Sequence, residues 1–188
     1  FRNIFTAQIL QNFTQVAAAV QSKIEQMHVD IEEMTNILVY TPDIMDFFAG
    51  KSDHTGKEKL EHIKKELDAI VAEKEMIHSI ILCNYDKQII MSGEGKAGIS
   101  GKIINDYDVF DKYISQPIYT TTYKQDTEEN CVYACIFPIN IPKKEIFYEN
   151  NYGLSIILFK AHNIREIINT IVADRKYEYI LVKDDNVI

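Results

Sequence analysis

The sequence is poor in several residue types that mark particular classes of protein. It has no tryptophan, three cysteines and four prolines among 188 residues. It contains no apolar run of about 18 residues, so we expect no membrane-spanning helix within it. Its formal net charge is −8, and basic residues never occur more than two in a row. Nucleic acid and anionic membrane surfaces are therefore excluded as partners of this segment.

The three cysteines do not predict a disulfide framework. Cys131 and Cys135 lie in one predicted strand, which separates them by about 13 Å. A disulfide requires Cα atoms within about 7 Å, so these two cannot bridge within that strand. Cys83 lies in another predicted strand and could meet only one of them. No CxxC motif or nearby histidine pair accompanies them, so we expect buried free thiols, no metal site and no cofactor.

The motifs of common enzyme classes are also absent. The sequence contains no HExxH, GxSxG or P-loop motif. Gly93, Gly95 and Gly98 match GxGxxG, but the segment before them is the return arm of a predicted hairpin. Dinucleotide binding requires a parallel strand that is followed at once by a helix. The pattern therefore favours a flexible loop over residues 93–101.

Acidic side chains gather after this glycine-rich segment, at Asp106, Asp108 and Asp111. Paired carboxylates can perform general acid–base catalysis, which leaves a hydrolase open as a weaker alternative. Acidic residues in a polar loop are usually only solvated, and the five histidines are scattered without ligand spacing. We therefore expect that this segment is not an enzyme.

The strongest pattern in the sequence is a long helical seam. Apolar residues recur at alternating spacings of four and three between Phe13 and Leu38. This spacing predicts one helix that runs from near Ile4 to about Tyr40 and spans roughly 54 Å. A helix of that length should project from its own domain. We expect the half after Met27 to be a core helix and the first half to self-associate or to continue another segment. The seam residues are Phe13, Ala17, Val20, Ile24, Met27, Ile31, Met34 and Leu38.

The remaining chain predicts shorter helices and strands. Thr41 can cap, and Pro42 can open, a short helix that stops at Gly50. The period then becomes strand-like, and two apolar runs joined by a two-residue turn predict a hairpin. The run at 153–160 is almost continuously apolar, which predicts a central strand buried on both faces. The expected helices are 42–49, 57–75, 109–115 and 163–173, and the expected strands are 77–85, 88–92, 131–139, 153–160 and 177–182.

Four segments carry a resemblance to a known family. They are VDIEEMTNILVYTPDIMDFF, IILCNYDKQIIMS, CVYACIFPI and GLSIILFKAHNIREII. Their order, with a long entry helix and an aromatic insert, resembles the Cache family, the PAS-like extracellular sensor modules of bacterial transmembrane receptors. The resemblance implies an α+β fold in which the long N-terminal helix packs on a PAS-like antiparallel β-sheet with flanking short helices.

The resemblance also implies a division of the chain. Residues 1–75 hold the long helix, the short helix and the second helix, and residues 76–174 form the PAS-like Cache module. The closing sequence YEYILVKDDNVI, within residues 175–188, resembles the opening hairpin of a second, membrane-proximal module, as in double Cache proteins. Because the chain begins without Met and ends inside this hairpin, we expect a segment of a longer protein.

The function that the resemblance implies is extracellular ligand sensing. The arrangement is similar to the extracellular part of sensor histidine kinases of low-GC Gram-positive bacteria, which touch the membrane only through helices outside this chain. A small molecule would bind here and the signal would leave through the long helix, paired with its copy in a parallel homodimer. The alternatives are a protein-interaction module without a small-molecule ligand, and the sensor region of a chemoreceptor or a membrane-bound AraC-type regulator.

Candidate ligand-binding residues lie in the tyrosine-rich insert. A tyrosine offers an apolar ring face together with a hydroxyl donor. The PAS-like arrangement places the insert opposite Tyr133, which shares one face of its strand with Cys131 and Cys135 by the two-residue period. Alternatively, the tyrosines simply fill the core. The predicted site consists of Tyr107, Tyr113, Tyr119, Tyr123, Tyr133 and Lys112.

The scarcity of arginine bears on the type of ligand. Amino-acid-binding members of the family use a motif that combines Arg, Trp and Tyr. This chain has no Trp, and none of its three arginines lies within residues 77–160. A carboxylate would depend on Lys112, Lys124 or backbone amides, which hold it less firmly than a bidentate guanidinium. We therefore expect an uncharged or weakly anionic ligand.

Overall fold

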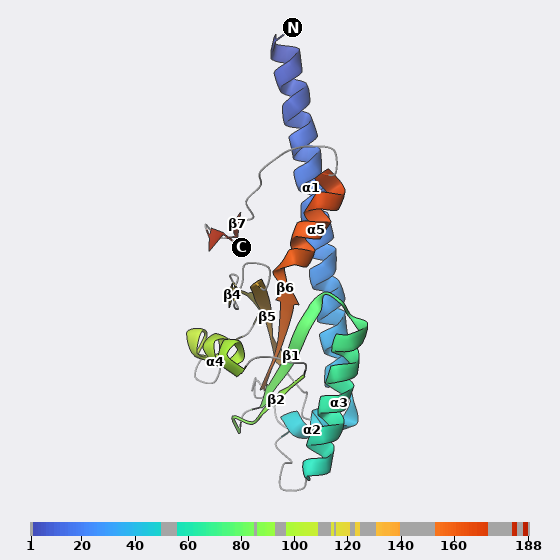
Figure 1. Cartoon of the computed structure of the whole chain (residues 1–188), viewed down its shortest axis with the longest axis vertical. Helices are drawn as coiled ribbons and strands as arrows, with labels where there is room; N and C mark the ends of the chain where they lie inside the picture. The colour runs from blue at the N-terminus through green and yellow to red at the C-terminus, as the bar shows by residue number, and fades with distance from the viewer. Residues whose placement is uncertain are drawn as a thin grey trace, which may run out of the picture.

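The computed structural model combines a long helix, a central antiparallel sheet and shorter helices on both faces of the sheet (Figure 1). Most of the predicted helix 109–115 and most of the predicted strand 177–182 lie outside the described residues. The structure describes residues 2–49, 56–84, 86–92, 97–108, 114, 116–120, 123–124, 131–139, 153–172, 182–183 and 186–187.

The helix α1 (Arg2–Val39) is the long helix that the seam predicts. Its C-terminal half packs on the sheet, where Ile31 is only 3% exposed. Its N-terminal end projects beyond the rest of the molecule (Figure 1), and Phe13 is 46% exposed. The predicted core half and the predicted projection are therefore both confirmed. Among the described residues, no helix is long and apolar enough to cross a membrane.

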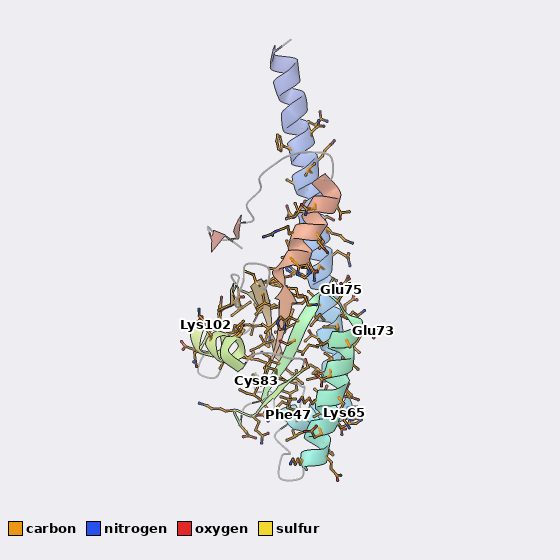
Figure 2. The ribbon with its side chains drawn as sticks, in the orientation of Figure 1. Phe47, Lys65, Glu73, Glu75, Cys83 and Lys102 are labelled. Atoms are coloured by element: carbon orange, nitrogen blue, oxygen red, sulfur yellow. The ribbon has the colours of Figure 1, made fainter. Side chains whose placement is uncertain are left out.

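Two short helical segments follow at one end of the sheet. The helix α2 (Pro42–Phe48) begins at Pro42 as predicted, but the Thr41 side chain makes no capping hydrogen bond. The buried face of α2 includes Phe47, and α3 (Lys57–Glu73) buries Ile63 and Leu67. Charged side chains such as Lys65 cover the exposed face of α3 (Figure 2). Both helices thus extend the apolar layer that α1 begins.

The sheet has the strand order β2-β1-β6-β5-β3, with β4 also paired to β5, and every pairing is antiparallel. The predicted hairpin is confirmed as β1 and β2, and the predicted central strand is confirmed as β6, which is buried from Gly153 to Phe159. The strands are β1 (Ile77–Asn84), β2 (Ile89–Met91), β3 (Ile118–Tyr119), β4 (Tyr123–Lys124), β5 (Cys131–Ile139) and β6 (Gly153–Lys160).

The helix α4 (Ala97–Asp106) corrects the prediction of a loop over residues 93–101. Its backbone is helical in spite of Gly98 and Gly101, each of which disfavours a helix by about 1 kcal/mol relative to alanine. Ile99 and Ile103, at helical spacing, pack in the apolar cluster against the sheet. Burial of this face outweighs the local preference of the glycines. A dinucleotide fingerprint remains excluded, because β2 is an antiparallel edge strand.

The end of the described chain contains one helix and a separate hairpin. The helix α5 (Ala161–Val172) follows β6 directly and lies alongside α1 (Figure 1). It confirms the helix predicted at 163–173, with Ile164 and Ile168 buried. The strands β7 (Val182–Lys183) and β8 (Asn186–Val187) pair only with each other among the described strands. The division of the chain into modules stays a prediction.

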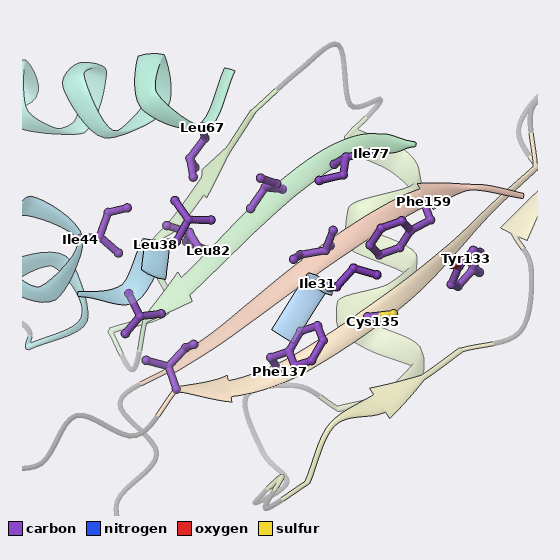
Figure 3. Packing of buried hydrophobic residues seen from close by; sticks show 14 of the residues in the cluster. Ile31, Leu38, Ile44, Leu67, Ile77, Leu82, Tyr133, Cys135, Phe137 and Phe159 are labelled. Atoms are coloured by element: carbon purple, nitrogen blue, oxygen red, sulfur yellow. The ribbon is translucent and has the colours of Figure 1, made fainter. Parts of the chain in front are cut away.

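Two apolar layers cover the two faces of the sheet. One layer, which we call the α1 face, joins α1, α2, α3 and α5 to the sheet through residues such as Leu82 and Phe159 (Figure 3). The other, the α4 face, packs α4 on residues such as Ile81 and Ile156. The fold is therefore α+β, with the long helix packed on an antiparallel sheet as the resemblance implies.

Candidate functional site

The structure distributes the predicted site residues over both faces of the sheet. Tyr107 and Tyr123 belong to the α4 face. Tyr119 and Tyr133 belong to the α1 face. The predicted placement of Tyr133 opposite the whole insert is therefore wrong. The other two predicted residues, Lys112 and Tyr113, lie outside the described residues.

The reason for this division is a shift in strand register. Tyr119 pairs with Cys135, whereas Tyr123 pairs with Val132, so the pairing moves by one residue between β3 and β4. In a regular strand, two residues four positions apart point to the same face. A shift of one residue moves the later side chain to the other face. The two-residue period therefore could not place both tyrosines correctly.

On the α1 face, Tyr133 is a core residue. Its ring stacks on Phe159 with 5.1 Å between centroids, and its hydroxyl lies 3.6 Å from the Met27 sulfur of α1. Burial raises the pKa of the Tyr133 phenol, with smaller contributions from Cys135 and Tyr119. Only 2% of the residue is exposed. Tyr133 therefore fills the core, the alternative that the sequence left open.

On the α4 face, a polar cluster surrounds Tyr123. The Tyr123 hydroxyl donates to an Asp106 carboxylate oxygen at 3.4 Å, and the Lys102 ammonium lies 5.5 Å from the ring centroid. Burial raises the pKa of Tyr123, and Tyr107 and Asp106 raise it further. Figure 2 places Lys102 on α4, on the side of the sheet away from α3. Two phenols, a carboxylate and an ammonium group thus meet at the C-terminal half of α4.

Beneath this layer lies a buried hydroxyl that the sequence pattern did not single out. Ser79 pairs with Leu158 of β6, which belongs to the α4 face, and Ser79 is 0% exposed. Its hydroxyl oxygen has no hydrogen-bond partner within the described part of the chain. A buried polar group without a partner costs about 1–3 kcal/mol, so it calls for a physical explanation. In the sequence, the only sign of this buried hydroxyl was a serine inside the apolar run IHSIILC.

Two of the three acidic residues lie within the described part of the chain. Asp106 contacts Tyr123, and Asp108 follows α4 with a left-handed backbone at φ 47°. The third acidic residue, Asp111, lies outside the described residues. The described ranges contain no group of three His, Cys, Asp or Glu side chains that could hold a metal ion.

The cysteines are free, as predicted, with Cys83 and Cys135 buried and Cys131 partly exposed. Burial raises the pKa of the Cys83 thiol from its ordinary value of 9.0 to about 12. Between these values the unfolded chain has lost the thiol proton and the folded chain keeps it, so stability falls as the pH rises.

We expect Cys83→Ala to remove about 1 kcal/mol per pH unit of this alkaline loss of stability between about pH 9 and 10. Urea unfolding at several pH values measures the slope. Cys131→Ala is the matched control at a partly exposed thiol. Equal slopes for the two variants would contradict the prediction.

Comparisons with known proteins show what class of fold this is. No protein-family model matches the sequence, and no curated protein matches it. Solved structures do match, and they are sensor domains. The sensory domain of the Campylobacter jejuni chemoreceptor Tlp3 (CcmL), with isoleucine bound, gives a TM-score of 0.58 at 11% identity over 88% of this chain and 65% of that chain.

Two further solved structures come from other receptors. The extracellular domain of vpHK1S-Z8, assigned as a histidine kinase, gives a TM-score of 0.54 at 10% identity over 82% of this chain and 58% of that one. A Vibrio parahaemolyticus domain assigned to the sensory box/GGDEF family gives a TM-score of 0.52 at 9% identity, over 82% of this chain and 61% of that one. The chain thus spans less than two thirds of each of these domains, and it has the fold of Cache-like extracellular sensor domains.

Proposed function

We propose that this chain is the extracellular ligand-sensing domain of a bacterial transmembrane signal-transduction receptor, without enzymatic activity of its own. Support comes from its fold, which it shares with a chemoreceptor sensory domain and with an extracellular domain assigned to a histidine kinase. From the sequence resemblance, we propose that the full-length protein is a sensor histidine kinase of a Gram-positive type bacterium. A second Cache module after residue 174 is part of the same proposal.

The ligand site that we propose lies on the α4 face, between the sheet and α4. The observation that carries it is the buried Ser79 hydroxyl without a described partner, on the same face of the sheet as Tyr123. A ligand that accepts or donates one hydrogen bond at Ser79 removes the desolvation cost of that hydroxyl. Tyr107 and Tyr123 offer ring edges and phenol groups at the same layer.

The same groups indicate the class of ligand. The described side chains here include two phenols, the Ser79 hydroxyl, one carboxylate and the exposed Lys102. None of these side chains is an arginine, whose guanidinium could hold an anion through two parallel hydrogen bonds. The set therefore favours a small ligand with several hydrogen-bonding groups and little net charge. The Tlp3 domain binds isoleucine, which is a neutral zwitterion. Zwitterionic amino acids therefore belong in the test beside sugars, polyols and amides.

Ser79→Ala is the direct test of this site. Without a ligand, removing the unpaired hydroxyl should raise the free energy of unfolding by about 1 kcal/mol. With a bound compound, the variant should show a smaller rise in melting temperature than the wild type, because one hydrogen bond to the compound is lost. Thermal-shift measurements with a panel of sugars, polyols, amides and amino acids, including L-isoleucine, give both quantities.

Ser155→Ala is a matched control on the other face. Ser155 is 1% exposed, has no described hydroxyl partner and pairs with Leu82 and Phe137 of the α1 face. It should gain similar stability and keep the full response to any compound. Equal responses of the two variants would contradict the site. A panel without any response would favour the interaction module over small-molecule sensing.

The signal should leave through α1, which we propose to pair with its copy in a parallel homodimer. Exposed apolar side chains along α1 support this proposal: Phe13 (46%), Val29 (48%) and Ile37 (74%). One helix buries limited area, so pairing of the isolated domain should be weak. Light scattering of the domain tethered to a dimerising anchor measures the pairing, and a strict monomer would contradict it.

A further inference from the structure

The outer edge of the sheet, formed by β3 and β4, has one tyrosine on each face. Tyr119 lies on the α1 face and Tyr123 lies on the α4 face, because the register shifts between them. Thr120 fixes the edge at this point. Its backbone N–H donates to the Ala134 carbonyl at 2.9 Å, and the Ala134 N–H donates to the Thr120 hydroxyl at 2.9 Å. Tyr119 is therefore held next to a doubly hydrogen-bonded residue.

On the α1 face, Tyr119 contacts the long helix directly. Its ring stacks on His28 of α1 with centroids 4.1 Å apart and planes 23° apart. The ring also meets Phe137 edge-on at 6.4 Å. Burial raises the pKa of Tyr119, and Cys135 and Glu32 raise it further. Through the stacked His28, Tyr119 is thus a contact of this sheet edge with the projecting helix α1.

On the α4 face, the same edge contacts the proposed ligand site. Tyr123 is 8% exposed and is linked to Asp106 and Lys102 of α4. A ligand that reached Tyr123 between α4 and the sheet would shift this ring or its α4 partners. Only three residues separate Tyr123 from Tyr119, and β3 and β4 are each two residues long. Apart from the two hydrogen bonds of Thr120, so short an edge has few described ladder hydrogen bonds to resist a small shift.

We propose that the β3–β4 edge couples the ligand site to α1, with Tyr119 and His28 as the positioning pair that transmits the change. A shift of Tyr123 on the α4 face moves the edge, and the Tyr119 ring carries the movement to His28 on the α1 face. The inference rests on the proposed function for its biological input. The described connection between the two tyrosines is β5, with which both β3 and β4 pair.

Hydrogen exchange of α1 tests the link without any ligand. Tyr123→Ala, which perturbs only the α4 face directly, should raise exchange of the α1 amides around His28 by about threefold or more through local opening. In a Tyr119→Ala background the basal exchange is already faster, and adding Tyr123→Ala should change it by less than about twofold. Amides of α3 serve as the internal reference for global unfolding.

Two conservative variants keep the test informative if an alanine variant folds poorly. Tyr119→Phe retains the stacked ring and should respond to Tyr123→Ala as the wild type does. Tyr123→Phe removes only the hydroxyl bond to Asp106 and should give a smaller effect of the same sign. If Tyr119 were merely structural, its loss would multiply the exchange rate equally in both Tyr123 backgrounds, and that result would overturn the inference.

The outcomes also separate this inference from the proposed function. Loss of coupling in a domain that still binds a compound of the panel would overturn only the inference. In the opposite case, the domain binds no compound of the panel and still shows an effect of Tyr123→Ala on α1 exchange that depends on Tyr119. That result would overturn ligand sensing and leave the coupling established.

Discussion

Ile31→Asp is expected to unfold the domain at ordinary temperature. Ile31 is 3% exposed in the apolar cluster that α1 forms with the sheet. Truncating such a side chain costs about 2–5 kcal/mol, and an unpaired carboxylate buried in its place adds to this loss. The sum approaches the whole stability of a domain, which is about 5–15 kcal/mol. Circular dichroism melting of the purified variant measures the effect.

The same helix provides two matched controls. Ile37→Asp lies on the exposed side of α1, at 74% exposure, and should change stability by less than about 1 kcal/mol. Phe13→Asp lies on the projecting half and should leave the melting temperature unchanged while weakening self-association in light scattering. A folded Ile31→Asp variant would contradict the assignment of the second half of α1 to the core.

Gly153→Ala is the second change expected to have a large effect. A β-carbon at this position would overlap the Cys83 carbonyl oxygen and would lie 2.7 Å from ring carbons of Phe48. The backbone there has φ +157°, which side chains rarely adopt. Because the oxygen belongs to the neighbouring strand, the β1–β6 pairing must open to relieve the overlap. We expect a loss of more than about 3 kcal/mol in urea unfolding.

Gly101→Ala is the control for this substitution. Gly101 lies within α4, and nothing lies within 4 Å of a β-carbon built there. Alanine favours the helix by about 1 kcal/mol relative to glycine, so this variant should be slightly more stable than the wild type. If Gly153→Ala were as stable as Gly101→Ala, the close approach of Phe48 and Cys83 to Gly153 would be wrong.

The sequence predicted those elements whose periodicity and burial agree. The α1 seam repeats every three and four residues, and β6 is apolar at nearly every position, so their types and places follow from side-chain pattern alone. The hairpin of β1 and β2 follows from two apolar runs and a short turn. Each of these elements buries its apolar residues in the way that its own pattern specifies.

The rest depended on contacts that a local pattern does not contain. The helix α4 forms over two glycines because its isoleucines are buried against the sheet. The separation of Tyr119 from Tyr123 follows from a single-residue register shift, which the two-residue period does not reveal. Ser79 could not be distinguished from a solvated serine until its neighbours in the sheet were known.

The central position of β6 has a consequence for the order in which the sheet assembles. Both neighbours of β6 precede it in the sequence, so β1 and β5 each present an unpaired edge until residues 153–160 join the sheet. Cys83 pairs with Leu154, and Ile77 pairs with Phe159. The contacts that complete the sheet therefore join residues that are distant along the chain. Open strand edges of this kind favour aggregation. The folding chain is therefore expected to be most prone to aggregation before its most apolar strand joins the sheet.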